Sequence, residues 1–356
     1  MMNTKTLSLK DNTLQPNFTG LTFRSFAISV KYFSNENPLP DKRIDYQSDI
    51  ILTAKTDGYV IDINKHDFWF NRHQPDLINE LITVDLSKTI YPVQAKIDKK
   101  GNFLGISNFN HIVNSRWHRN KLNSTSKYTT KIAQTFYNAF ERNLENRTVF
   151  EKSMHHDWFW NLFFHPKYIH YGDQNAIETD LYLAVIPYEN PVKFTGTQKI
   201  NIDTTNYHSV EIQFISSEMK AADYFIPKNI SPLSGDHFYM SVKVYFDLDV
   251  YYLFPMHTRA YFEVYSKDSD GKKTFVKRIE FTQYQQGTEN NKTKPARKKN
   301  SFLVEDEEEH YDSKKIYKTY DGKDYSYQEW MDFEAEQYKL YMEKKKKKGF
   351  WDFLGF

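Results

Sequence analysis

Residues 50–63 read IILTAKTDGYVIDI, and this stretch decides the fold. Apolar side chains alternate with other residues on both sides of Thr56-Asp57-Gly58. A period of two is that of a half-buried strand, and Asp-Gly between two such runs marks a tight turn. The alternating apolar positions are Ile50, Leu52, Ala54, Tyr59, Ile61 and Ile63. The stretch therefore predicts a β-hairpin.

Helical spacing becomes frequent after this hairpin. Pro75 and Asp76 suit the first turn of a helix, and a second hairpin follows with its turn at residues 98–102. Apolar residues then recur at helical spacing from residue 108 to the very aromatic run Trp158 to Phe164. Residues 1–172 therefore predict an α+β domain whose antiparallel sheet is covered by helices on one side.

Strand patterns dominate again from residue 173 to residue 285. Successive runs alternate apolar and polar residues, and the last two are joined by the turn Asp268-Ser269-Asp270-Gly271. This half predicts a mainly antiparallel β domain. Residues 11–33 have an extended pattern that suits either sheet, and the pattern does not choose between them.

A charged arm follows the body of the chain. Residues 286–325 have few apolar side chains and many charged ones, which predicts a disordered linker. Ser326-Tyr327-Gln328-Glu329 matches a capping box ahead of an amphipathic helix. A lysine run and the apolar sequence GFWDFLGF, residues 349–356, end the chain. Residues 326–356 are thus predicted to be a helix with a lysine-aromatic terminal tag.

The terminal tag has no core of its own to join, so we expect another surface to cover it. One candidate is a groove on another protein subunit, where aromatic side chains are common anchors. A second is an anionic membrane surface, to which each lysine contributes about 1 kcal/mol. A third is the body of this chain. The predicted partner-binding residues are Trp330, Phe333, Phe350, Trp351, Phe353, Leu354 and Phe356.

The composition argues against several chemistries. The chain has no cysteine, which excludes disulfides, thiolate nucleophiles and cysteine-held zinc or iron–sulfur sites. It has neither of the common glycine-rich phosphate loops and no G-x-S-x-G motif. With 48 basic and 46 acidic residues the net charge is only +2, and Trp117 among the basic residues 116–121 continues an apolar helix face. We expect no cofactor and no nucleic-acid partner.

Histidines and acids gather between residues 155 and 173. Imidazole and carboxylate are ligands for zinc, iron or nickel, so a metal-dependent enzyme centred here is an alternative. The spacing does not match H-E-x-x-H, however, and half-buried histidines that bond a backbone carbonyl explain the pattern more simply. The residues concerned are His155, His156, Asp157, His165, His170 and Asp173. Two carboxylate pairs suited to glycoside cleavage, Asp62 with Asp67 and Asp247 with Asp249, occupy positions where turns commonly place acids.

The N-terminal sequence MMNTKTLSLK is polar and lacks the apolar core of a secretory signal. No stretch approaches the roughly 20 apolar residues that a membrane-spanning helix needs. We expect a soluble, cytoplasmic protein. If the terminal tag binds lipid, the protein would be peripheral to the inner membrane.

The chain resembles uncharacterised cytoplasmic proteins that accompany contractile, type VI-like secretion machinery in bacteria. The likeness rests on Tyr91-Pro92-Val93 with the turn at 98–102, on Arg116-Trp117, and on the lysine-aromatic terminus. It implies a structural or adaptor role in a baseplate or an associated complex, and it transfers no catalytic residue. We therefore expect a non-enzymatic component of a multiprotein bacterial assembly that docks another subunit through its C-terminal arm.

Overall fold

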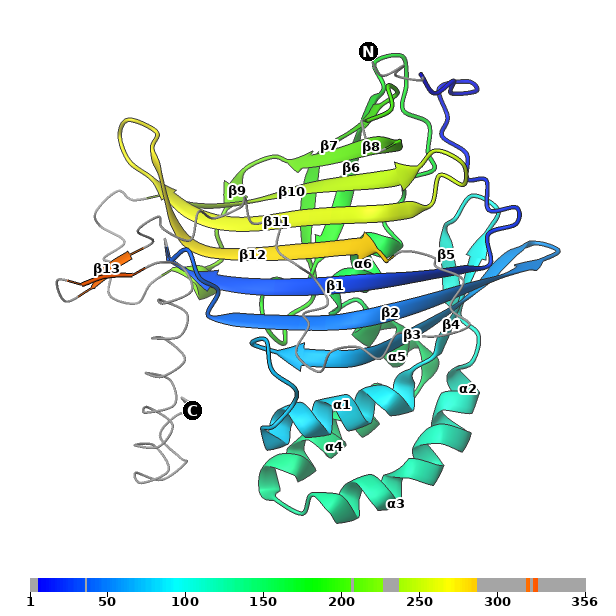
Figure 1. Cartoon of the computed structure of the whole chain (residues 1–356), viewed down its shortest axis with the longest axis vertical. Helices are drawn as coiled ribbons and strands as arrows, with labels where there is room; N and C mark the ends of the chain where they lie inside the picture. Colours follow the sequence, from blue (N-terminus) through cyan, green and yellow to red (C-terminus); the bar gives the residue numbers. More distant parts are fainter. Residues whose placement is uncertain are drawn as a thin grey trace. The chain divides into compact units, whose positions relative to one another are not determined.

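A computed structural model describes residues 6–35, 37–205, 208–226, 237–286, 318–320 and 323–325. Its main feature is one 12-stranded sheet in the order β5-β4-β3-β2-β1-β12-β11-β10-β8-β7-β6, with the short β9 also paired to β10 (Figure 1). Every pairing among these strands is antiparallel. The fold is therefore dominated by sheet, as the alternating patterns predicted.

The strand bounds follow the predicted hairpins closely. The strands are β1 (Phe23–Ser34), β2 (Lys42–Lys55), β3 (Gly58–Phe70), β4 (Val93–Asp98), β5 (Phe103–Ile106), β6 (Ala176–Leu183), β7 (Val192–Asn201), β8 (Ser209–Ser216), β9 (Met219–Lys220), β10 (His237–Asp249), β11 (Pro255–Lys267) and β12 (Lys273–Gln285). At the turn between β2 and β3, a Cβ added to Gly58 would lie 2.1 Å from the carbonyl oxygen of Ile97. Glycine is required there because β4 passes so close to the turn.

The two predicted domains share this one sheet. β1 pairs with β2 on one side and with β12 on the other, so residues 11–33 contribute a strand to both halves. Residues 1–304 form one compact unit. The predicted division after residue 172 is corrected accordingly: it does not separate two sheets, because β1 joins them by backbone hydrogen bonds.

Helices gather behind the sheet and beyond β3 in Figure 1. They are α1 (Ile78–Ile90), α2 (Phe109–His111), the π-helical segment η1 (Ile112–Trp117), α3 (His118–Lys127), α4 (Lys131–Asn143), α5 (Arg147–Met154), α6 (Trp158–Phe163) and the 3₁₀ turn η2 (Asp223–Phe225). The side chain of Thr130 caps α4 by accepting a hydrogen bond from the backbone N–H of Ala133. Of the helices in the described residues, none has the length and apolarity needed to span a bilayer.

Helix α6 forms the centre of the core. All six of its residues are buried. Its aromatic rings contact strands from different parts of the sheet. Trp158 stacks on Phe281 of β12 with ring centroids 6.4 Å apart, and Trp160 meets Phe103 of β5 at 5.5 Å. The aromatic run that the sequence placed in the helical part of the first half thus packs against strands of both halves.

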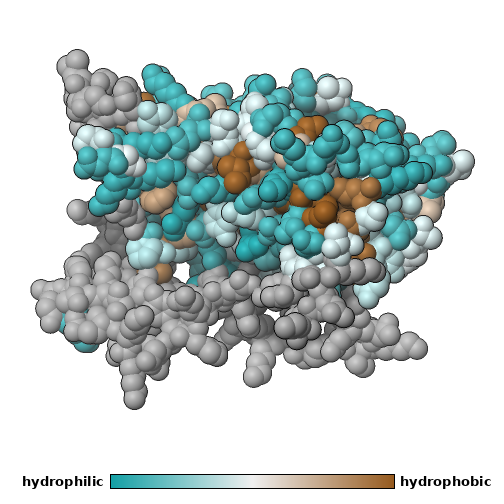
Figure 2. Space-filling model, turned by 90° about the horizontal axis from the view of Figure 1, so that it is seen from above, coloured by the Kyte–Doolittle hydropathy of each residue, from teal (hydrophilic) through white to brown (hydrophobic). Residues whose placement is uncertain are grey.

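On most strands, polar side chains alternate with core residues and occupy the opposite, outer face of the sheet. On β1 and β2 several outer-face residues are buried as well, among them Ala27, Ser29 and Asp45. Seen from above, the described surface is mainly hydrophilic, with hydrophobic residues in small separate patches (Figure 2).

Residues 305–356 form a second compact unit. Its described part is a hairpin of β13 (Lys318–Tyr320) and β14 (Lys323–Tyr325), which lies inside the predicted linker 286–325. The rest of that linker beyond Gln286, the predicted helix and tag of 326–356, and all seven predicted partner-binding residues lie outside the described residues.

Candidate functional site

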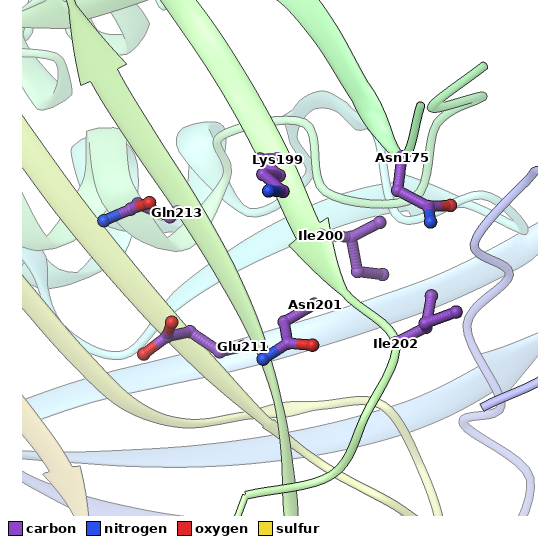
Figure 3. A pocket seen from close by; sticks show the side chains of 7 residues that line it. All are labelled: Asn175, Lys199, Ile200, Asn201, Ile202, Glu211 and Gln213. Carbon is purple, nitrogen blue, oxygen red and sulfur yellow. The ribbon is translucent and has the colours of Figure 1, made fainter. Parts of the chain in front are cut away.

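A polar pocket of about 320 Å³ opens at β7 and β8 (Figure 3). It is lined by Asn175, Lys199, Ile200, Asn201, Ile202, Glu211 and Gln213. Most of these are side chains with hydrogen-bonding or charged groups. The pocket is therefore suited to a polar ligand rather than to an apolar one.

The register of the two strands places the polar side chains together. Lys199 lies opposite Gln213, and Asn201 lies opposite Glu211. Successive side chains of a strand point to opposite faces, so these four share the outer face while Ile200 is buried on the core face. Two neighbouring rows of the sheet thus form the floor of the pocket.

Several of these groups have no partner among the residues that the structure describes. Within the described part of the chain, the side chains of Lys199, Gln213 and Asn175 make no hydrogen bond or ion pair. Asn201 accepts a hydrogen bond from the backbone N–H of Asp203 at 3.1 Å, which leaves its amide nitrogen available. An ammonium group and several amide groups therefore remain free to contact a bound molecule.

Glu211 connects the pocket to an ionic cluster on the next strands. It lies directly opposite Asp247 of β10, and Arg259 of β11 approaches Glu211 at 3.9 Å and Asp247 at 3.7 Å. Nδ1 of His257 is 3.5 Å from Asp247. Burial and the charge of Asp247 raise the pKa of Glu211, while Arg259 opposes the shift. We name Glu211, Asp247, His257 and Arg259 the outer-face ionic cluster.

In each of the two carboxylate pairs considered from the sequence, the two acids have different partners. Asp247 belongs to the outer-face ionic cluster, but Asp249 accepts hydrogen bonds from the backbone N–H groups of the turn at 251–254. Asp62 accepts a hydrogen bond from Gln94 at 2.8 Å, and Asp67 contacts His66 at 3.1 Å. The carboxylate that faces Asp247 is Glu211, which only the strand register identifies.

The histidines of residues 155–173 do not converge on one point. His155 hydrogen-bonds Asn161 at 2.9 Å, and Nδ1 of His170 lies 2.9 Å from the carbonyl oxygen of Asp11. Nε2 of His165 donates to Gln198 at 2.6 Å, and burial and then the charge of Lys167 lower the pKa of His165 to about 3. These contacts match the structural interpretation of the pattern rather than a shared metal centre.

Two buried lysines hold the ends of α6. At its start, Asp157 caps the helix and contacts the ammonium of Lys65, which also lies 4.6 Å from the ring centre of Tyr46 and 4.8 Å from that of Phe159. At its end, the ammonium of Lys167 donates to the carbonyl oxygens of Leu162, Phe163 and His165 at 2.8, 3.0 and 3.0 Å. Burial lowers the pKa of both lysines, that of Lys167 to about 7.

Among the described residues, the one group of side chains close enough to share a metal ion is His73, Asp76 and Glu80, whose ligand atoms lie within 4.8 Å of one another. A carboxylate oxygen of Glu80 already lies 3.3 and 3.4 Å from the backbone N–H groups of Asp76 and Leu77. These residues stand at the start of α1, where the helix dipole disfavours a cation. They are better explained as a helix cap.

Two of the motifs behind the resemblance meet in the structure, whereas the lysine-aromatic terminus lies outside the described residues. The guanidinium of Arg116 donates to the carbonyl oxygens of Ile90 and Pro92 at 2.7 and 2.8 Å, and the Tyr91-Pro92 bond is cis. Arg116 lies in the π-helical segment η1. The Tyr-Pro-Val and Arg-Trp motifs therefore form one structural junction between α1, β4 and η1.

No protein family model matches the chain. No curated protein matches its sequence either. Among solved structures, a dehydratase domain from the CurJ module of the curacin polyketide synthase aligns at 10% identity over 73% of this chain and 75% of that one, with a TM-score of 0.08. A TM-score this low supports no inference about fold or activity.

Proposed function

We propose that the protein is a non-enzymatic structural or adaptor component of a multiprotein bacterial assembly, and that its sheet is a rigid platform for another subunit. The contractile, type VI-like secretion system is the assembly that the sequence resemblance suggests. Docking through the C-terminal arm, by way of the predicted residues at 330–356, remains part of this proposal.

The main support is a set of tyrosines on the outer face of β10 and β11. The rings of Tyr245 and Tyr261 meet edge to face with their centroids 6.4 Å apart. Tyr239 stacks at 6.3 Å on Tyr265, which is itself fully buried and supports the ring of Tyr239 from below. The guanidinium of Arg259 lies 5.3 Å from the ring centre of Tyr245. Tyrosine and arginine are enriched where proteins bind one another, and rings already held in place lose little entropy on binding.

The use of the buried ionisable groups also favours this proposal. The buried side chains of Lys65, Lys167 and His165 lie at or next to the ends of α6, where they form hydrogen bonds or ion pairs within the core. Groups with shifted pKa values are often catalytic, but structural networks shift pKa values as well. Here the contacts explain these groups as parts of the fold.

The test is purification of the full chain with its subunit partners from the native host, identified by mass spectrometry and then reconstituted with purified components. Tyr245→Ala with Tyr261→Ala is expected to weaken binding by about 30-fold or more, as for hot-spot residues worth about 2 kcal/mol. Tyr182→Ala on β6, where the tyrosine is 49% exposed, is the matched control.

Four outcomes decide the proposal. Loss of binding in the tyrosine double variant supports docking on the sheet, and loss only after deletion of residues 326–356 supports docking through the arm. Absence of a stoichiometric protein partner would overturn both. Flotation with vesicles that requires anionic lipid would favour a peripheral membrane role for the arm instead.

A further inference from the structure

We propose that the pocket at β7 and β8 binds a small zwitterion of the α-amino-acid class. Lys199 would hold its carboxylate and Glu211 its ammonium group. This site borders the tyrosines of β10 and β11, since Tyr245 lies directly opposite Gln213. The ligand proposal does not depend on the proposed docking role.

The first argument is the diagonal placement of the two charges. Because Lys199 faces Gln213 and Asn201 faces Glu211, the lysine and the glutamate occupy opposite corners of a four-residue rectangle. Diagonal neighbours in an antiparallel pair are separated by about 7–8 Å. This separation leaves space for a small molecule that carries both charges. Lys199 and Glu211 both line the pocket, and Figure 3 shows their side chains.

The second argument is the unused hydrogen-bonding capacity at the Lys199 end. The ammonium of Lys199 is exposed, and the amides of Gln213 and Asn175 have no partner among the residues described. A carboxylate accepts bonds from an ammonium and from amide N–H groups, and such charge-assisted bonds are stronger than neutral ones. The donors at this end therefore fit a carboxylate.

The third argument is the state of Glu211. Its nearest cation, Arg259, is 3.9 Å away and is also 3.7 Å from Asp247, so one guanidinium serves two carboxylates. The raised pKa of Glu211 has burial and the charge of Asp247 as its causes. A ligand ammonium would give Glu211 a cation of its own, because Arg259 is shared with Asp247.

The size of the pocket narrows the ligand class. A pocket of about 320 Å³ accommodates a small molecule of the size of a single amino acid. Glutamine has that size, and its side-chain amide suits the amide walls of Asn175 and Asn201. A dicarboxylate would place a negative charge at Glu211, and a diamine would place a positive charge at Lys199.

The test uses the full-length protein and isothermal titration with L-glutamine as the probe. Saturable binding with one site is expected. Lys199→Gln and Glu211→Gln are each expected to weaken it by about tenfold, the loss of one charged hydrogen bond of about 1.5 kcal/mol. Lys243→Gln, which removes an exposed lysine of β10 outside the pocket, is expected to leave binding unchanged.

Glutarate and 1,4-diaminobutane, which bear only one sign of charge, are expected to bind at least tenfold more weakly than glutamine. Absence of glutamine binding at about 10 mM, where an affinity near −3 kcal/mol still registers, would overturn the proposal. So would equal binding in the two pocket variants and in Lys243→Gln. None of these results alters the subunit-binding test, because that test measures binding of another protein and not of glutamine.

Discussion

The side chain of His66, on the outer face of the sheet, contacts two carboxylates next to a shift in the register of β2 and β3. Its Nε2 contacts Asp49 at 3.0 Å and its Nδ1 contacts Asp67 at 3.1 Å. Both ring nitrogens donate only in the imidazolium form. Asp67 has a φ of +53°, and the register of β2 and β3 shifts between Asp45 and Gln47. The charged ring therefore ties a strained bulge to its neighbouring strand.

These contacts predict a specific pH dependence of stability. Hydrogen bonds to Asp49 and then to Asp67 raise the pKa of His66 from 6.5 to about 9. A raised folded-state pKa adds stability that is complete below about pH 6.5 and is lost as the pH rises through about 9. Relative to His66→Gln, the wild type is expected to lose about 1–3 kcal/mol of unfolding free energy across this range.

Urea unfolding of both proteins at about pH 6 and about pH 9.5 checks this prediction. The difference between wild type and variant isolates His66 from other groups that titrate in the same range. A difference that is constant across the two pH values would mean that His66 does not bridge the two carboxylates as an imidazolium.

At the scale of elements, α6 depends on side chains that lie outside it. A helix of six residues has more terminal backbone groups than internal hydrogen bonds, so its ends need partners. Lys167 supplies donors for three carbonyl oxygens at one end, and Asp157 with Lys65 serves the other. The aromatic sequence supplies the burial, while these polar contacts make that burial compatible with the backbone.

Lys167→Met is therefore expected to destabilise the protein by about 2–4 kcal/mol. The methionine would fill much of the same volume, but the carbonyl oxygens of Leu162, Phe163 and His165 would remain buried without donors. Lys243→Met on the outer face is the control and is expected to change stability by less than about 0.5 kcal/mol. Equal unfolding midpoints in urea for the two variants would show that Lys167 is not needed at the helix end.

The sequence predicted individual strands and hairpins better than it predicted which strands pair with one another. The turns at Asp57-Gly58 and Asp268–Gly271 specify hairpins through local backbone geometry, and both hairpins are present. The strand β1 could not be assigned because a period of two reports which face is buried and not which strands lie beside it. Lys199 and Glu211 were missed for the same reason, since only the pairing of β7 with β8 brings them to one pocket.

The position of β1 between β2 and β12 joins the strands of residues 1–172 and 173–285 into one sheet. This N-terminal strand connects the hairpins of the first half to the strands of the second, and α6 packs against both. A sequence-based boundary at residue 172 follows a change in local pattern. The long-range pairing of β1 with β12 leaves no such change in the sequence, so the single sheet was not foreseen.

This connection predicts that the two halves do not fold separately. Residues 1–172 alone would expose the β12 edge of β1 and one side of α6, and residues 173–285 alone would lose the rings that cover Phe281 and Phe254. Each fragment is expected to lack a cooperative urea transition, whereas an equimolar mixture refolded together regains one. Circular dichroism and tryptophan fluorescence of residues 1–286 as an intact chain should give coincident transitions. A cooperative transition in either isolated fragment would restore the boundary after residue 172.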